Sequence, residues 1–154
     1  MDKKSIKIIA VNRKVKFDYF IDDQFEAGLV LTGTEVKSLR IGKANLKDSY
    51  ATIKNGEAFL LQAHIGEYPF AKYGNHSPDR PRKLLLHKRE IKRLYGKSRE
   101  KGYSLIPTKL YFRGGKAKVE LALARGKRKY DKREQIKRRD EKRDLDRARK
   151  NNYG

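Results

Sequence analysis

The last thirty residues, 125–154, constrain this chain more than any other segment. They contain fourteen Lys or Arg and six Asp or Glu, an excess of eight positive charges. Apart from Ala148, their only aliphatic side chains are Ile136 and Leu145. A segment so poor in apolar side chains cannot build a core, so we expect it to be solvated or only weakly helical alone. This C-terminal tail is predicted to become ordered by laying its cations along a polyanion.

The preceding residues, 1–124, are long enough for one modest core. We therefore expect two units, a body of residues 1–124 and the tail of residues 125–154. The body is also basic, with twenty-six Lys or Arg against thirteen Asp or Glu. Nucleic acid is the default partner of a chain with a pI of about 10.2. A membrane surface is disfavoured because the tail lacks the apolar face of an interfacial helix.

Several classes of protein are excluded by what the sequence lacks. There is no cysteine, which removes disulfides, thiolate zinc sites and thiol nucleophiles. No run resembles a signal peptide or approaches the roughly 18 apolar residues of a membrane span. We expect a soluble, cytoplasmic monomer that requires no cofactor.

Two hairpins are the clearest local signals. Residues 49–54 and 57–65 flank Asn55-Gly56, the strongest short signal for a hairpin turn. Residues 103–112 and 116–124 flank a second turn at 113–115, which puts Pro107 at an edge or a bulge.

The other elements are predicted from periodicity and from turn residues. We expect strands at 6–11 and 26–31, the second preceded by a turn at 22–24. A short helix follows, with Thr34 as a possible N-cap and Gly42 at its end. Residues 66–82 are rich in Pro and Gly and predict a long loop, and residues 84–95 predict an amphipathic helix.

This inventory indicates a fold that is mainly β with inserted helices. Our preferred form is a small antiparallel β-barrel of the oligonucleotide-binding type, because closure protects the edges of short strands. A split α+β sheet fits nearly as well. The basic C-terminal tail is added to either fold, disordered or helical on binding.

The sequence offers little catalytic chemistry. It has no phosphate-binding loop, no dinucleotide fingerprint and no paired histidines of a metalloprotease, and its three histidines are far apart. Asp22 and Asp23 are adjacent, so we interpret them as turn residues and not as a metal clamp. We therefore expect a binding protein with no metal site and no enzymatic activity.

Three residues have two readings each. Glu26 is either solvated or accepts hydrogen bonds from base edges or ribose hydroxyls of RNA. His76 is a loop residue that either touches RNA or has no such role. Tyr130 lies among Lys and Arg and is either exposed or a ring that stacks on a base.

The tail after Tyr130 repeats its cations around one broad helical face, and its uncancelled charge predicts binding that falls steeply with salt.

Several blocks resemble one family, the bacterial SmpB proteins that bind the RNA called SsrA. The similar blocks are EAGL at 26–29, GTEVKSLR at 33–40, NLKDSY at 45–50, RPRKLLLHK at 80–88, YDKR at 130–133, and Ile136, Lys137 and Arg139. The resemblance covers nearly the whole chain.

The resemblance implies an oligonucleotide-binding barrel that binds the tRNA-like domain of transfer-messenger RNA and acts in trans-translation, the rescue of stalled ribosomes. The alternative is a general ribosomal or RNA-chaperone protein. In the body, the implied RNA-binding positions are Asn12, Glu26 and Leu85, with Arg13, Lys14 and Lys83 as helpers. The tail is implied to enter the vacant messenger channel, near the decoding centre of the small-subunit rRNA. Its expected contact residues are Lys127, Arg128, Lys129, Tyr130, Asp131, Lys132, Arg133, Ile136, Lys137 and Arg139.

Overall fold

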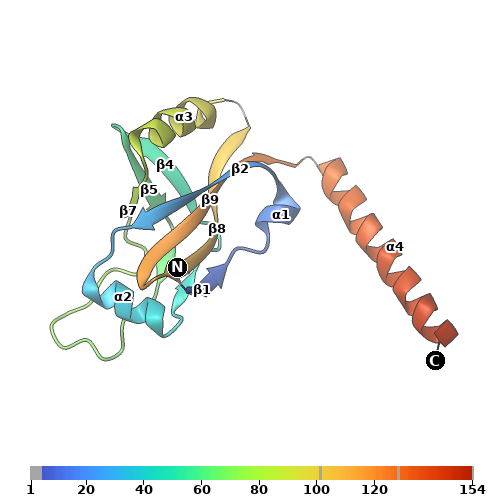
Figure 1. Cartoon of the computed structure of the whole chain (residues 1–154), viewed down its shortest axis with the longest axis horizontal. Helices are drawn as coiled ribbons and strands as arrows, with labels where there is room; N and C mark the ends of the chain where they lie inside the picture. The colour runs from blue at the N-terminus through green and yellow to red at the C-terminus, as the bar shows by residue number, and fades with distance from the viewer. Residues whose placement is uncertain (1–4, 101, 128, 154) are drawn as a thin grey trace.

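Antiparallel strands close into a ring in the body of the protein (Figure 1). The computed structural model describes residues 5–100, 102–127 and 129–153. The strands of the ring follow one another in the order β8 (Tyr103–Arg113), β4 (Tyr50–Lys54), β5 (Glu57–Leu61), β7 (Arg82–Leu85), β2 (Tyr19–Leu29) and β9 (Lys116–Gly126), and β9 pairs with β8 again. The prediction of a mainly β fold with inserted helices is confirmed. The ring agrees with an oligonucleotide-binding barrel, and that more specific assignment stays a prediction.

Both predicted hairpins are present. Asn55 and Gly56 join β4 to β5 with φ values of 53° and 75°, as a tight two-residue turn between strands requires. Gly114 and Gly115 join β8 to β9, also with positive φ. The register of the second hairpin shifts just after Pro107, because proline cannot donate to the ladder.

Two shorter pairings complete the β-structure. β1 (Ile6–Val11), a predicted strand, pairs with β8 beside the ring. β3 (Ala44–Asn45) and β6 (His64–Ile65) form a separate small sheet. The predicted long loop follows β6 and ends where β7 begins.

The helix predicted at residues 84–95 is wrong at its start. Arg82–Leu85 is strand β7, which fills the place between β5 and β2 in the ring. Its side chains alternate between buried and exposed, and the first buried one is an arginine, which concealed the strand pattern. The helix α3 (Lys88–Ser98) begins later and continues past Gly96.

The turn predicted at residues 22–24 is also wrong. β2 runs through it, with a register shift between Ile21 and Asp23. Asp22 accepts a hydrogen bond from Tyr103 Oη at 2.7 Å, and Asp23 pairs with Arg93 at 2.7 Å. Partners from distant segments therefore hold two acidic residues in a strand that local propensity disfavours.

The strand predicted at 26–31 and the helix after it are present with shifted bounds. The strand is part of β2 and ends at Leu29. The helix α2 (Gly33–Arg40) is capped by Thr32 and not by Thr34, and Thr32 forms a capping box with Glu35. Gly42 follows the helix with a φ of 75°.

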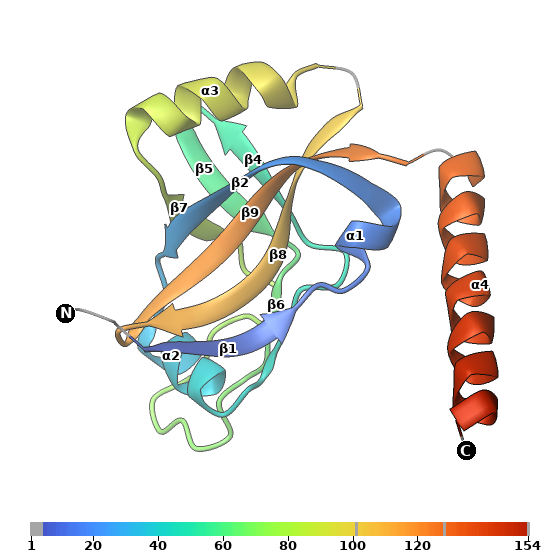
Figure 2. The ribbon, with the colours of Figure 1, turned by 45° about the vertical axis from the view of Figure 1, so that its right-hand side comes forward.

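Aliphatic side chains fill the inside of the ring. Leu60, Leu84 and Val119 come from the strands and are at most 1% exposed. α2 and α3 lie at opposite ends of the barrel (Figures 1 and 2) and contribute Leu39 and Leu94, each 0% exposed. The two helices therefore close the core at its two ends.

Beyond β9, the chain forms one long helix, α4 (Lys129–Tyr153), that extends away from the body (Figure 2). The helical spacing of the cations in the tail thus corresponds to a helix in the structure. The described side chains between Lys137 and Arg147 are all exposed, so this part of α4 packs no apolar stripe against the body. Among the described residues, no helix combines the length and apolarity needed to span a bilayer.

Candidate nucleic-acid interface

A fixed carboxylate lies on the outer face of the barrel. Glu26 is on β2, and its Oε2 accepts hydrogen bonds from Tyr111 Oη at 2.5 Å and from Arg113 Nε at 2.9 Å. Both donors come from β8, on the far side of β9. The bond from Tyr111, followed by that from Arg113, lowers the pKa of Glu26 despite its partial burial. The carboxylate is therefore ionised at neutral pH and held in one position.

The phenol beside Glu26 remains a donor. Burial, followed by the bond to Glu26, raises the pKa of Tyr111 to about 12. Tyr111 is only 3% exposed, because β1 pairs along β8 there. Since the Glu26 side chain is 37% exposed, it can still accept hydrogen bonds from a ligand.

An exposed leucine lies next to this carboxylate. Leu85 of β7 is 55% exposed and pairs with Gly28, two residues beyond Glu26 on β2. A Cβ at Gly28 would come within 3.3 Å of Leu85 Cβ and 3.7 Å of Lys118 Nζ. The absence of a side chain at Gly28 thus lets Leu85 and Lys118 approach each other over the strand.

Lys118, Tyr111 and Arg113 were not among the predicted site residues. The alternation in β9 could have pointed to Lys118, because its neighbour Val119 is fully buried and the lysine must face outward. No local signal could have linked Tyr111 and Arg113 to a carboxylate more than eighty residues earlier in the chain. We call Glu26, Leu85, Tyr111, Arg113 and Lys118 the outer-face cluster.

Lys83 belongs to the same face. It lies two residues before Leu85 on β7, and both are exposed while Arg82 and Leu84 are buried. Its Nζ is 3.5 Å from Glu57 Oε1 in an exposed ion pair. Of the predicted body residues, the structure thus brings Glu26, Lys83 and Leu85 onto one surface.

Asn12 lies further along the barrel. Its backbone N–H donates to Thr108 O at 2.7 Å, and its Nδ2 donates to Pro107 O at 3.2 Å. Thr108 Oγ1 in turn donates to Glu120 Oε2 at 2.5 Å, and Glu120 is the strand partner of Glu26. Asn12 thus supports the β8 bulge and connects to the outer-face cluster through it.

Arg13 and Lys14 are exposed and connect β1 to the short helix α1 (Val15–Asp18). They lie beside Asn12 in sequence, at the end of β1 and away from Leu85. The six predicted body residues therefore form two groups, one on β2 and β7 and the other between β1 and α1.

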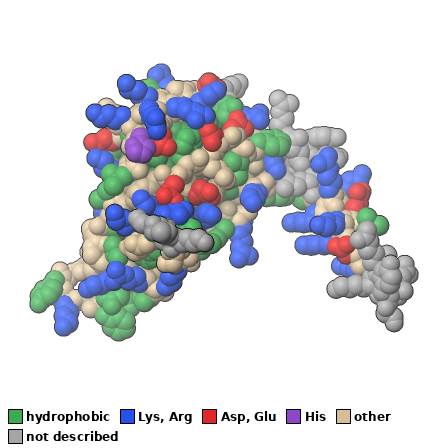
Figure 3. All heavy atoms as spheres, in the orientation of Figure 1, with side chains coloured by type: hydrophobic (Ala, Val, Ile, Leu, Met, Phe, Trp, Pro, Cys, Tyr) green, Lys and Arg blue, Asp and Glu red, His purple; other side chains and the backbone are tan. Residues whose placement is uncertain are grey.

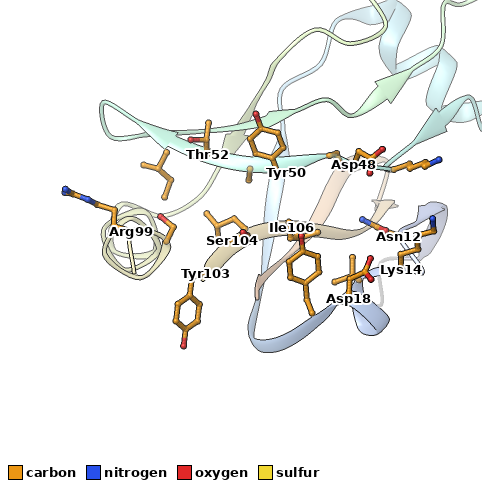
Figure 4. Close-up of a pocket in the computed structure, with 18 of the residues that line it drawn as sticks. Asn12, Lys14, Asp18, Asp48, Tyr50, Thr52, Arg99, Tyr103, Ser104 and Ile106 are labelled. Carbon is orange, nitrogen blue, oxygen red and sulfur yellow. The ribbon is translucent and has the colours of Figure 1, made fainter. Parts of the chain in front are cut away.

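A groove of about 690 Å³ opens between β4 and β8. These strands pair only at Ala51 and Leu105, so they diverge on either side of that contact. Figure 4 shows Tyr50 and Ser104 on its two sides, with Asn12 and Lys14 at one end and Arg99 at the other. Tyrosines, cations and the acids Asp18 and Asp48 thus border a groove of mixed polarity next to the Asn12 group.

The root of the tail is held against the body. Lys127 donates from its backbone N–H to Asp18 O at 2.8 Å and from Nζ to Lys16 O at 2.9 Å. Its Nζ also lies 5.0 Å from the centre of the Phe20 ring, and Arg125 approaches the same ring at 5.7 Å. These cation–π contacts fix where the tail leaves the barrel.

The remaining predicted tail residues are in α4 or just before it. Arg133, Lys137 and Arg139 are exposed, and Ile136 is half-buried. Arg128 lies outside the described residues. The side chains of Lys129, Tyr130, Asp131 and Lys132 also lie outside the described part, so the two readings of Tyr130 stay open. Figure 3 shows the described cations of α4 as a group separate from the body.

The remaining candidate side chain, His76, has structural partners. His76 is 8% exposed and bonded to Thr34 and to the backbone of Ile65. Within the described ranges, no group of three or more His, Asp or Glu could hold a metal ion.

Comparison with known proteins agrees with this geometry. The family model described as SmpB protein matches residues 9–151. An SsrA-binding protein of Syntrophobacter fumaroxidans is 62% identical over 144 residues, which cover 94% of this chain and 89% of the relative. An SsrA-binding protein of Shouchella clausii is 58% identical over 142 residues, covering 92% of this chain and 91% of the relative.

A solved structure is also similar. A chain from the work described as "tmRNA-SmpB: a journey to the center of the bacterial ribosome" is 48% identical, with a TM-score of 0.67. The match covers 82% of this chain and 92% of the solved one. On the strength of the family model and of these relatives, the chain belongs to the SmpB family.

Proposed function

We propose that this chain binds transfer-messenger RNA and brings it to stalled ribosomes in trans-translation. The observation that carries the proposal is the outer-face cluster, where an ionised acceptor, Glu26, lies beside exposed Leu85 and the cation Lys118. Such a set suits RNA, since a carboxylate accepts from base edges or 2′-hydroxyls, an exposed leucine packs on a splayed base, and a lysine meets phosphate. The names of the relatives, SsrA-binding protein, support the same partner.

The proposal divides the chain into two working parts. The body, residues 1–124, recognises the tRNA-like domain of the RNA through the outer-face cluster together with Lys83 and the Asn12, Arg13 and Lys14 group. The tail, residues 125–154, enters the vacant messenger channel near the decoding centre. Its exposed cations, such as Arg133 and Lys137, meet ribosomal RNA there, and Tyr130 stacks on a base. The tail thereby senses that no message blocks the channel.

This function is recognition without catalysis, carried out in the cytoplasm by a monomer. Binding falls with salt, because each lysine or arginine that neutralises a phosphate releases a counterion. A nuclease activity is tested directly by incubating the bound RNA with Mg²⁺ or Mn²⁺, and the RNA is expected to stay intact.

Two measurements on the full chain test the proposal. Transfer-messenger RNA is expected to co-purify with the protein, and Glu26→Ala is expected to weaken its binding. Glu100→Ala is the matched control, because Glu100 is exposed and its ion pair among the described residues is with Lys97 in its own segment. Unchanged affinity in a folded Glu26→Ala variant would show that Glu26 binds Tyr111 and Arg113 but makes no contact with the RNA.

The alternative function, a general ribosomal or RNA-chaperone protein, predicts a different result. Such a protein would bind bulk tRNA as tightly as transfer-messenger RNA at moderate salt. Clear preference for the one RNA excludes this alternative, whereas equal affinity would overturn the proposal.

A further inference from the structure

The loop between β6 and β7 carries aromatic rings that the core does not use. In residues 66–80, which we call the aromatic loop, Phe70 is 72% exposed and Tyr73 is fully exposed. The rings of Tyr68 and Phe70 meet edge to face, with centroids 5.6 Å apart. Figure 1 shows this loop extending from the end of the barrel below α2. Adjacent exposed aromatic side chains on a protruding loop indicate a contact surface.

The far end of the aromatic loop is held by a buried histidine. His76 Nε2 lies 2.9 Å from Ile65 O, a carbonyl that can only accept, so Nε2 carries the proton. His76 Nδ1 lies 2.9 Å from Thr34 Oγ1 and shares a hydrogen bond with it. One ring thus connects this end of the loop both to β6 and to α2.

Two arginines hold the segment where the aromatic loop leads back into β7. Arg82 is 0% exposed and donates to Ala63 O at 2.6 Å and to Pro78 O at 3.0 Å. Arg80 and Arg82 both bind the carboxylate of Glu35 on α2, each at 2.6 Å. Buried ionic groups with several partners are costly to disturb, so these contacts fix the path of the loop.

An asparagine braces the loop nearer its tip. Asn75 Oδ1 accepts from Tyr68 N at 3.0 Å, and Asn75 Nδ2 donates to Tyr68 O at 2.8 Å. The backbone of Ala71 also donates to Tyr68 O at 3.3 Å. The chain on either side of Phe70 and Tyr73 is therefore cross-linked by hydrogen bonds, and the rings are presented from a preorganised loop.

Cations lie on the aromatic loop and on the neighbouring α2 segment. Lys37 Nζ lies 5.7 Å from the centre of the Tyr68 ring, and Lys72, within the loop, is exposed. Arg40 and Lys43, at the end of α2, are exposed as well. Against these stands Glu67, an exposed acid of the loop. The other acid of the loop, Asp79, has its Oδ1 3.2 Å from His64 Nδ1. Figure 3 shows hydrophobic and basic side chains together at the end of the molecule where Figure 1 draws this loop.

We propose that the aromatic loop is a second RNA-binding site of the body, in which Phe70 and Tyr73 stack on unpaired bases while Lys37 and Lys72 meet the neighbouring phosphates. Rings flanked by cations favour a single-stranded polyanion over a protein, because every base offers a face for stacking. The RNA is transfer-messenger RNA, since the loop runs directly into β7, whose Lys83 and Leu85 face the proposed site. The inference rests on the proposed function and extends its surface to the end of the barrel.

The test compares two double variants of the full chain. Phe70→Ala with Tyr73→Ala removes both rings, whereas Phe70→Tyr with Tyr73→Phe keeps them. The first variant is expected to bind transfer-messenger RNA roughly tenfold or more weakly, and the second close to the wild type. Because no charge changes, the salt dependence of binding should keep its slope. Because both side chains are exposed, the Tm should not move.

The outcomes separate this inference from the proposed function. If Glu26→Ala weakens binding and loss of the two rings does not, the aromatic loop is no RNA site and the proposed function stands. A ring-free variant that keeps its RNA affinity but loses binding to ribosomes or to a protein would likewise overturn the inference. If the wild type shows no preference for transfer-messenger RNA over bulk tRNA, both proposals fail.

Discussion

Glu35 and Arg82 form an ion pair in which both side chains are 0% exposed. The guanidinium of Arg82 lies 2.6 Å from Glu35 Oε2. Arg80, in the aromatic loop, lies 2.6 Å from Glu35 Oε1. Glu35 also accepts from Thr32 N at 2.8 Å, within the capping box of α2. One carboxylate thus joins α2, β7 and the aromatic loop at the end of the barrel.

Removing this carboxylate's charge should destabilise the fold. Glu35→Gln leaves the buried Arg82 without its counter-charge, which typically costs about 3–5 kcal/mol of the free energy of unfolding. Urea denaturation at neutral pH measures the loss. The control is Glu57→Gln, because its partner Lys83 is exposed and such a pair is worth about 0–1 kcal/mol. Equal effects of the two substitutions would contradict the role given to the buried pair.

The same residue should make stability depend on pH. Burial raises the pKa of Glu35, but hydrogen bonds from Arg80, Thr32 and Arg82 outweigh it and lower the pKa to about 2. At pH values between the unfolded pKa of 4.5 and the folded pKa of about 2, the unfolded chain binds more protons than the folded chain. The contribution of Glu35 is therefore complete above about pH 4.5 and declines as the pH falls towards 2.

Comparing the wild type with Glu35→Gln isolates that contribution from other carboxylates, such as Asp22 and Glu26, whose pKa values are also lowered. The difference in urea midpoint should be constant from pH 7 to 5 and should narrow from pH 4 to 3. If the difference instead widens in acid, the pH dependence assigned to the Glu35 contribution is wrong.

A side chain at Gly28 should disturb the outer-face cluster. Gly28→Val places a branched side chain where even a Cβ comes 3.3 Å from Leu85 Cβ, so Leu85 and Lys118 must move. Overpacking of this kind costs about 1–3 kcal/mol, and RNA affinity should fall with it. Gly33→Ala is the control, because nothing lies within 4 Å of a Cβ there. Normal RNA binding by a folded Gly28→Val variant would mean that the arrangement of Leu85 and Lys118 is irrelevant.

Lys118 should contribute to RNA binding even though the sequence did not single it out. Lys118→Ala removes the cation beside Glu26 and Leu85, and the salt slope of log K should fall by about one if Lys118 meets a phosphate. Lys116→Ala is the comparison, since Lys116 is exposed next to the β8–β9 turn. If the two variants bind alike in a salt titration, Lys118 has no specific contact.

The sequence could predict the parts of the fold that local chemistry determines. Asn55-Gly56 and Gly114-Gly115 require positive φ, so their hairpins were predictable from dipeptides. β7 was not, because a buried arginine, Arg82, occupies a core position and only pairing with β5 and β2 makes the segment a strand. The acidic stretch at Asp22 was misread for the same reason, since its partner Tyr103 comes from β8.

The candidate site follows the same division. Glu26 and Leu85 could be named because the blocks around them resemble a family. The donors Tyr111 and Arg113 and the cation Lys118 could not, because only the register of β2, β9 and β8 brings them to Glu26. Residues that depend on sheet register are invisible to a search for short motifs.

The central claim is that the body holds the RNA while the tail senses the empty channel, and deletion of residues 132–154 tests it most directly. The shortened chain keeps the outer-face cluster and the tail root at Lys127, so it should bind transfer-messenger RNA as the full chain does. It should nevertheless fail to support the tagging of peptides on stalled ribosomes. Loss of both activities, or retention of both, would contradict the division of labour between body and tail.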